Sequence, residues 1–320
     1  MLLPSERLAP STATDFVTDV AEYLQRTPRQ LPSRYFYDAL GSALFDAICR
    51  LPWYRVTRAE TALLARHARE IFEPLPRPLN ITELGCGNGE KLAVLLENSQ
   101  ERFRRVHLVD ISPAALRSAR ARLAVLPAIP VTTFQGTYEQ GLSRLATHRG
   151  HGAWLVLFLG SNIGNFDPPA ARDLLRQIRA SLAKDDALLL GTDLIKSQRA
   201  LQLAYDDPLQ VTAAFNRNLL RRINDELGGT FDLDSFAHRA LWNPHESRVE
   251  MHLVSSRAQL VRIAAADLEI EFKQDESIWT ESSYKYDPEQ VLSEGRLAGF
   301  SGGEQWIDED ARFALTLFRA

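Results

Sequence analysis

The chain has 320 residues, of which 45% are hydrophobic and 24% charged, a composition ordinary for a globular protein. A net charge of -4 argues against a nucleic-acid partner, and no apolar run approaches the ~18 residues that span a bilayer. The two cysteines, Cys49 and Cys86, suit a reducing compartment and show no metal spacing, and Met1–Glu22 does not resemble a signal peptide. We therefore expect a cytoplasmic protein of enzyme size that binds no metal, membrane or nucleic acid. A monomer is a separate expectation, which the composition does not decide.

Helices and apolar strands alternate through the middle of the chain. After a predicted helix at Glu60–Ile71, strands are expected at Leu79–Leu84, Val106–Val109, Val131–Phe134, Trp154–Leu159 and Ala187–Leu190, with helices between them at Lys91–Glu97, Pro113–Val125, Tyr138–Thr147 and Pro168–Leu182. This alternation indicates an α/β fold with a mostly parallel, doubly wound, Rossmann-like sheet.

The alternation breaks after Leu194. Helical patterns fill Gln198–Leu227, interrupted at Asp206–Pro208, and strands are expected at Arg248–Leu253 and Leu268–Phe272. A helix at Pro288–Ala298 and strands at Gly303–Ile307 and Phe313–Phe318 then return to the sheet pattern. We predict a sheet domain formed by residues 59–195 plus 286–320, and a smaller α+β domain formed by 1–58 plus 196–285.

A glycine loop follows the first predicted strand. Gly85, Gly87 and Gly89 stand at alternate positions before a helix, and Asp110 ends the next strand about 20 residues later, the spacing at which an acid meets a ribose hydroxyl. The loop looks like the first motif of S-adenosylmethionine-dependent methyltransferases. Lys91 could meet the methionine carboxylate or could be a solvated helix lysine. The alternative is a glycine turn after a core strand, followed by a solvated aspartate.

A second polar loop, Leu159–Phe166, follows the fourth predicted strand. Loops at the carboxyl ends of parallel strands hold the ligands of open α/β sheets. Asn165, followed by Phe166, is similar to the catalytic loop of amino-methylating enzymes. The alternative is a turn whose residues tolerate left-handed conformations.

Tyrosines gather in two further stretches, Tyr35–Arg58 and Ala204–Asn216. Tyrosine faces attract a methylated amine through cation–π interaction, although an interdomain core is the simpler reading of any single aromatic. Glu281 and Ser283, at alternate positions, would share one side of an extended segment and could bond the two nitrogens of an imidazole. Otherwise a capping or surface role is expected for them.

Motifs along the chain from about Tyr35 onward belong together. They are Phe36-Tyr37-Asp38-x-x-Gly41-Ser42, Leu51-Pro52-x-Tyr54, Thr57-Arg58-x-Glu60, Glu83-Leu84-Gly85, Gly160-Ser161-x-Ile163-Gly164-Asn165-Phe166, Ala204-Tyr205-Asp206-Asp207, Phe215-Asn216, Glu250-Met251-His252-Leu253 and Glu281-x-Ser283. With them the chain resembles the ergothioneine-pathway histidine Nα-methyltransferases, and the resemblance implies a class I methyltransferase sheet with an inserted substrate-binding domain.

The resemblance also implies a role for each matched residue. Asn165 and Tyr205 would hold the amino-acid carboxylate, Tyr37 and Tyr54 would line the amine and cofactor side, Glu281 and Ser283 would read the imidazole, and Met251 would pack nearby. We predict Tyr37 and Asn165 as catalytic, and S-adenosylmethionine contacts from Tyr54, Gly85, Gly87, Lys91, Asp110, Thr137 and Tyr138. The sequence departs from the family pattern at Trp53, at Asn162, and at Thr137-Tyr138, where an acidic–aromatic pair usually stands beside the adenine.

The implied activity is trimethylation of the α-amine of free L-histidine to its betaine, hercynine. Two alternatives remain open at this point. One is an N-methyltransferase for another free amino acid, tryptophan or tyrosine, which Glu281 disfavours. The other is a non-catalytic protein that senses S-adenosylmethionine.

Overall fold

The computed structural model describes residues 13–99, 103–126, 129–147 and 150–320, and the chain forms two compact units. Val56–Ile195 and Tyr284–Ala320 belong to the first unit, and the described residues up to Arg55 join Lys196–Ser283 in the second. These limits differ by a few residues from the domain boundaries expected from sequence. Residues 1–12 of the predicted smaller domain lie outside the described part of the chain.

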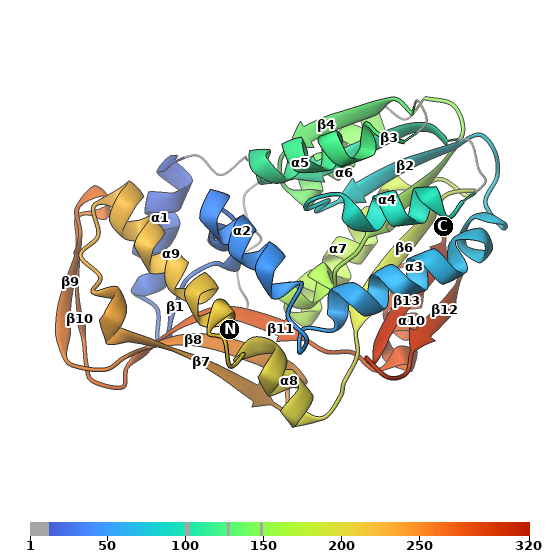
Figure 1. Cartoon of the computed structure of the whole chain (residues 1–320). Coiled ribbons are helices and arrows are strands. Elements are labelled where there is room, and N and C mark those ends of the chain that lie inside the picture. Colours follow the sequence, from blue (N-terminus) through green and yellow to red (C-terminus); the bar gives the residue numbers. More distant parts are fainter. Residues whose placement is uncertain (1–12, 100–102, 127–128, 148–149) are drawn as a thin grey trace. The chain divides into compact units, whose positions relative to one another are not determined.

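The first unit is built on a seven-stranded sheet (Figure 1). Its strand order is β12-β13-β6-β5-β2-β3-β4, formed by Gly302–Asp308, Phe313–Arg319, Ala187–Asp193, Ala153–Phe158, Leu79–Leu84, Phe103–Asp110 and Val131–Gln135 respectively. β2 to β6 pair in parallel, whereas β13 runs antiparallel to both β6 and β12. The predicted doubly wound sheet with its terminal hairpin is confirmed.

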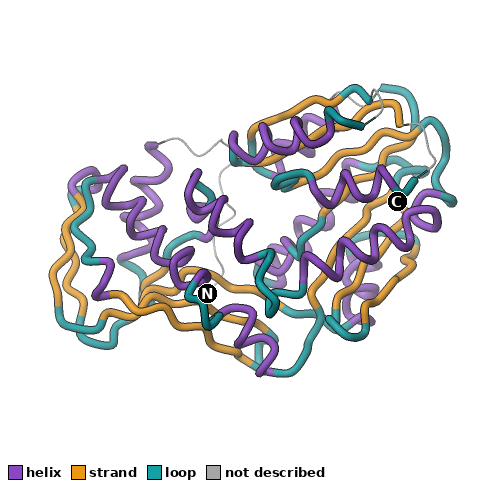
Figure 2. Tube along the Cα trace, in the orientation of Figure 1, coloured by secondary structure: helices purple, strands orange, loops and turns teal. Residues whose placement is uncertain are grey.

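Helices cover both faces of this sheet, as the purple and orange tubes of Figure 2 show. One face carries α3 (Val56–Phe72), α4 (Glu90–Glu97) and α5 (Pro113–Leu123); the other carries α6 (Tyr138–Thr147), α7 (Pro168–Ser181) and α10 (Pro288–Leu297). Every residue of β2, β5 and β6 is buried, because a central strand covered on both faces meets no water. The strand order reverses between β2 and β5, and ligands of such sheets bind at the carboxyl ends of the strands beside that point.

The second unit has its own sheet, of order β1-β11-β8-β7 (Arg29–Gln30, Ser277–Tyr284, Arg248–Ser255, Phe236–Asn243), and a separate pair β9 (Gln259–Ile263) and β10 (Leu268–Phe272). Its helices are α1 (Ala13–Leu24), α2 (Ala39–Ile48), α8 (Gln198–Tyr205) and α9 (Val211–Leu227). α9 packs against α2 on one side and against β7 and β8 on the other. The sequence did not predict β1, β7, β9 or β11 as strands.

The break between α8 and α9 has a local cause. Asp206, Asp207 and Pro208 stand there, and the carboxylate of Asp207 accepts hydrogen bonds from the backbone N–H groups of Val211 (3.2 Å) and Thr212 (2.7 Å). These are donors that the first turn of a helix cannot satisfy internally. The Asp-Asp-Pro sequence therefore ends one helix and caps the next.

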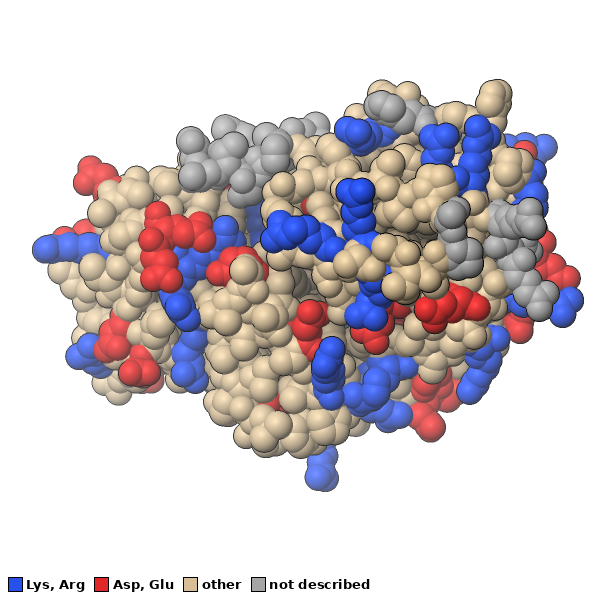
Figure 3. Space-filling model, turned by 45° about the horizontal axis from the view of Figure 1, so that its top comes forward, with Lys and Arg blue, Asp and Glu red and all other residues tan. Residues whose placement is uncertain are grey.

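Charged groups of both signs are interspersed on the face shown in Figure 3. In the described residues, no helix combines the length and apolar character needed to cross a membrane. Nor does any group of three or more His, Cys, Asp or Glu side chains in that part of the chain have an arrangement that could hold a metal ion.

Candidate functional site

The glycine loop lies between β2 and α4 and leaves room above its main chain. Gly87 has a φ of +51°, and a Cβ placed there would meet nothing within 4 Å. Glycine is suited to this backbone conformation, and the open space lets a ligand lie directly against the peptide groups. The loop therefore has room for a nucleoside cofactor in direct contact with its main chain.

Asp110 at the end of β3 holds this loop in place. Its Oδ2 accepts a hydrogen bond from the N–H of Gly87 (2.9 Å), and its Oδ1 accepts one from the N–H of Ser112 (2.9 Å). Burial raises the pKa of this carboxyl above its ordinary value, while the backbone N–H groups act in the opposite direction. A carboxylate offers about four lone-pair positions, so Asp110 keeps acceptor capacity for the predicted ribose diol.

Glu83, just before the glycine loop, is a buried acid with an unsatisfied oxygen. Its side chain is only 2% exposed, and its Oε2 has no hydrogen-bond partner among the described residues. Burial raises the pKa of Glu83 to about 8, with Lys91 opposing and Glu60 and Asp110 reinforcing that shift. The loop therefore begins beside a carboxyl group that stays protonated at neutral pH.

This protonation makes the stability of the ligand-free protein depend on pH. An unfolded Glu83 releases its proton near pH 4.5, whereas the folded protein keeps it until about pH 8. The stabilisation is complete below pH 4.5 and is lost as the pH rises towards 8. We expect Glu83→Gln, which cannot titrate, to gain several °C in Tm relative to wild type between pH 5 and 8, measured by thermal unfolding. Parallel Tm profiles would show that Glu83 is ionised in the folded protein.

A buried acid that the sequence analysis did not single out connects the cofactor loop with the second polar loop. Glu60 of α3 is fully buried, its Oε2 lies 2.6 Å from the Nζ of Lys91, and both its oxygens lie 2.9 Å from the N–H of Gly160. A Cβ on Gly160 would stand 2.9 Å from the Lys91 Nζ. Lys91 is thus neither a solvated lysine nor placed by its own helix alone: Glu60 sets its position.

The loop that carries Asn165 is fixed from several sides within the first unit. Ser161 has a φ of +58°, a conformation that residues other than glycine rarely adopt and that is often found at functional sites. Its Oγ accepts a hydrogen bond from the N–H of Asp193 (2.9 Å), and the carboxylate of Asp193 pairs with the fully buried Lys285 (3.0 Å). Asn165 ends the short helix η2 (Asn162–Asn165) directly after these contacts.

Thr137 and Tyr138 both lie at the start of α6, close to the glycine loop. The Thr137 Oγ1 accepts from the N–H of Gln140 (3.4 Å), and the Gln140 side chain accepts from the N–H of Thr137 (3.0 Å). This reciprocal pair caps the helix, so the Thr137 hydroxyl has a structural partner. A Cβ on Gly85 would lie 3.2 Å from the Tyr138 hydroxyl, which places that phenol at the loop.

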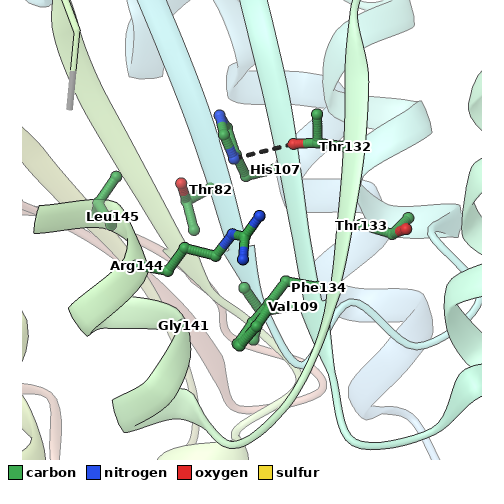
Figure 4. A pocket seen from close by; sticks show the side chains of 9 residues that line it. All are labelled: Thr82, His107, Val109, Thr132, Thr133, Phe134, Gly141, Arg144 and Leu145. Atoms are coloured by element: carbon green, nitrogen blue, oxygen red, sulfur yellow. Dashed lines mark hydrogen bonds between the residues drawn. The ribbon is translucent and has the colours of Figure 1, made fainter. Parts of the chain in front are cut away.

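A small cavity of the first unit is lined by residues of β2, β3, β4 and α6 (Figure 4). It is about 20 Å³ in volume and is lined by Thr82, His107, Val109, Thr132, Thr133, Phe134, Gly141, Arg144 and Leu145. A cavity of this size accommodates about one water molecule, whereas ligand pockets have several hundred Å³. It includes none of the predicted site residues and is not the cofactor site.

Several predicted substrate residues meet in the second unit. The hydroxyl of Tyr205, the last residue of α8, lies 2.8 Å from the Oγ of Ser283 on β11, and both side chains are buried. The ring of Tyr54 meets that of Tyr205 edge to face at 6.3 Å. The structure therefore brings Tyr54, Tyr205 and Ser283 together, and Glu281 lies two residues before Ser283 on the same strand.

Tyr37 joins the same unit through aromatic contacts. Its ring packs edge to face on Phe45 (5.7 Å) and Phe215 (5.9 Å), and Phe45 in turn meets Tyr54 at 6.3 Å. Met251 is buried on β8, and its carbonyl oxygen lies 3.0 Å from the Thr280 hydroxyl. Phe45 was not among the predicted site residues, because an apolar helix position indicates only core.

The comparison with protein families decides the assignment. A family model described as histidine-specific methyltransferase, SAM-dependent, matches residues 16–320. The chain belongs to this family. Its sheet is accordingly a class I methyltransferase sheet with S-adenosylmethionine as the cofactor, as predicted.

Curated relatives extend along the same length. The histidine N-alpha-methyltransferases of Mycolicibacterium smegmatis and Mycobacterium tuberculosis are 42% and 40% identical, and the alignments cover 97% and 93% of this chain and 96% and 93% of the relatives. Ergothioneine biosynthesis protein 1 of Schizosaccharomyces pombe is 28% identical over 90% of this chain, which corresponds to 39% of that longer protein.

Proposed function

We propose that this protein transfers three methyl groups from S-adenosylmethionine to the α-amine of free L-histidine, forming hercynine in ergothioneine biosynthesis. The chain belongs to a histidine-specific methyltransferase family, and one observation within it carries the proposal. On strand β11, Glu281 and Ser283 stand two residues apart, and the Ser283 hydroxyl bonds that of Tyr205. An acceptor and a hydroxyl at that spacing suit the two nitrogens of an imidazole. The cytoplasmic location and the monomeric state stay predictions.

The residues of the first unit fit the cofactor. The open main chain at Gly87 suits the nucleoside, the Asp110 carboxylate suits the ribose diol, and Lys91, held by Glu60, suits the methionine carboxylate. When bound, S-adenosylmethionine supplies an electrophilic methyl group on a sulfonium.

The chain's contribution to catalysis is mainly the positioning of the amine. The nitrogen must attack in line as the free base; the new C–N bond forms as the methyl–sulfur bond breaks, and a proton leaves the nitrogen before each attack. Holding two reactants in this geometry contributes several kcal/mol without a general base. The tyrosine faces of the second unit, Tyr37, Tyr54 and Tyr205, suit the cationic product through cation–π interaction.

The proposal is tested by mass spectrometry of purified protein with S-adenosylmethionine and a panel of free amino acids. Histidine gaining three methyl groups, with the other amino acids unchanged, is the expected result. Methylation of tryptophan or tyrosine instead would keep the methyl transfer and overturn the imidazole-reading role of Glu281 and Ser283. No turnover with any amino acid would favour a sensor of S-adenosylmethionine.

We expect Glu281→Ala to raise the KM for histidine by about 10- to 100-fold, the equivalent of a hydrogen bond to a charged group. The KM for S-adenosylmethionine should change little, because Glu281 is not among the residues predicted to contact the cofactor. Initial-rate kinetics with each substrate varied in turn measure both constants.

Glu269→Ala is the matched control for this substitution. Glu269 lies on β10 of the same unit and pairs with Arg262 at the surface. Its removal should leave both KM values unchanged. Equal increases in both constants for Glu281→Ala would count against an imidazole-reading role.

A further inference from the structure

Asn216 of α9 is the centre of a buried hydrogen-bond network in the second unit. Its side chain is 0% exposed; its Nδ2 lies 2.9 Å from the Nδ1 of His238 and 3.1 Å from the carbonyl oxygen of His252, and its Oδ1 accepts from the Thr280 hydroxyl at 2.8 Å. All three polar contacts lead to different strands. Asn216 therefore ties α9 to β7, β8 and β11 at one point.

The partners fix the orientation of the amide and the tautomer of the imidazole. A carbonyl oxygen can only accept, so the amide nitrogen must face His252, and its second hydrogen then points to the His238 Nδ1. That nitrogen accepts, so the His238 proton is on Nε2, which lies 2.8 Å from the carbonyl oxygen of Tyr205. Burial lowers the pKa of His238, in agreement with a neutral ring.

The carbonyl of Tyr205 lies at the carboxyl end of a helix. Tyr205 is the last residue of α8, and the final carbonyls of a helix have no partner within the helix. His238 supplies that partner and so fixes the backbone from which the phenol extends. The same Asn216 holds β11 through Thr280, three residues before Ser283. Both ends of the Tyr205–Ser283 hydrogen bond are thus anchored to one amide.

We propose that Asn216 and His238 form a positioning pair that places Tyr205 and Ser283 for recognition of the amino-acid substrate. Neither residue needs to touch the substrate. His238 acts through the carbonyl of Tyr205, and Asn216 acts through His238 and Thr280. The inference rests on the proposed function for the identity of the substrate.

Asn216→Leu is the first test, with Asn224→Leu as its matched control. Asn224 lies on the same helix, and its side chain makes two hydrogen bonds, to the carbonyl (2.8 Å) and the N–H (2.9 Å) of Phe231. Both variants should lower the Tm. Only Asn216→Leu should raise the KM for histidine, by about tenfold, with the KM for S-adenosylmethionine within about twofold of wild type. Unchanged or equally raised constants in a folded Asn216→Leu protein would overturn the proposal.

A second test compares His238→Leu with His238→Gln. The glutamine amide can donate to the Tyr205 carbonyl as the imidazole Nε2 does. The KM for histidine should therefore rise much less in His238→Gln than in His238→Leu. In a Tyr205→Phe background, His238→Leu should add little further increase, because its effect passes through the Tyr205 phenol. Additive increases, or no recovery by glutamine, would show a merely structural role.

The wild-type assay separates this inference from the proposed function. If the wild type methylates another amino acid, the histidine assignment fails, and the same variants are measured with that amino acid. If the wild type binds histidine without turnover, calorimetric Kd values replace KM. In each case, the KM or Kd for the amino acid in Asn216→Leu is compared with the same constant in Asn224→Leu. A higher constant in Asn216→Leu alone supports the positioning role of Asn216 and His238.

Discussion

Glu60→Ala should be among the most damaging single substitutions in the first unit, lowering the Tm and weakening S-adenosylmethionine binding together. The change removes the acceptor of the Gly160 N–H and the buried partner of the Lys91 ammonium. Removing one member of a buried ion pair typically costs about 3–5 kcal/mol, and the partial exposure of Lys91 reduces this figure. We expect a loss of roughly 2–3 kcal/mol in unfolding free energy, and an increase of at least about tenfold in the Kd for S-adenosylmethionine.

Two further variants show which property of Glu60 matters. Glu60→Gln keeps an acceptor for Gly160 without the charge, so it should recover part of the stability but little of the cofactor affinity. Glu70→Ala is the matched control, since Glu70 lies on the same helix and bonds the Trp306 indole at the surface. Thermal unfolding and calorimetric titration measure both effects. A Glu60→Ala protein that behaves like Glu70→Ala would contradict the proposed link.

Asp110→Asn should weaken S-adenosylmethionine binding more than any other conservative change in the glycine loop region. An amide has only one acceptor oxygen, so one of the two N–H groups of Gly87 and Ser112 would face an NH₂ group. The loop then loses its anchor at the same time as the predicted ribose contact is weakened. We expect the Kd to rise about 100-fold, equivalent to about 2.7 kcal/mol.

Asp186→Asn is a closely matched control for this substitution. The Asp186 carboxylate also accepts two backbone N–H groups, from Trp154 and Ala183, both at 2.8 Å, but it lies before β6 at the amino end of the strand. Its amide variant should lose stability and keep its cofactor affinity. If calorimetry gave equal Kd values for both variants, Asp110 would act only as a structural anchor.

The sheet of the first unit could be predicted because its signals are local. Trp154–Leu159 is a continuous apolar run, and the strand that it forms is buried on both faces. The glycines at positions 85, 87 and 89 and the aspartate at 110 are marked by spacing alone. The loop, its acid and the alternation of helices with parallel strands thus followed from short stretches of sequence.

The strands of the second unit are hard to predict because they contain polar residues whose hydrogen-bond partners lie far away in the chain. On β7, His238 interrupts the apolar pattern. The strand tolerates this polar side chain because Asn216 and the Tyr205 carbonyl satisfy its two nitrogens. On β11, the acceptors near the buried Thr280 hydroxyl lie on other elements: the Asn216 side chain, 64 residues earlier, and the Met251 carbonyl.

Glu60 was missed for the same reason. An acid on a helix usually faces water, and nothing near Glu60 in sequence shows that Gly160, 100 residues later, will bond it. The motif Thr57-Arg58-x-Glu60 was the one available signal, and it carried no indication of chemistry. Buried polar groups need hydrogen-bond partners, and a local sequence pattern does not show a partner that is distant in the chain.

The discontinuity of both units sets an order of assembly during synthesis. In the second unit, Asp38 accepts a hydrogen bond from Asn218, 180 residues later, and α2 packs against α9. At translation rates of about 5–20 residues per second, α2 is synthesised roughly 9–36 s before that partner, and its apolar face stays uncovered during this time. The first unit is finished later still, because β13 inserts between β12 and β6. A chain that ends before Phe313 would therefore leave β6 without its antiparallel partner, as an unpaired edge of the sheet.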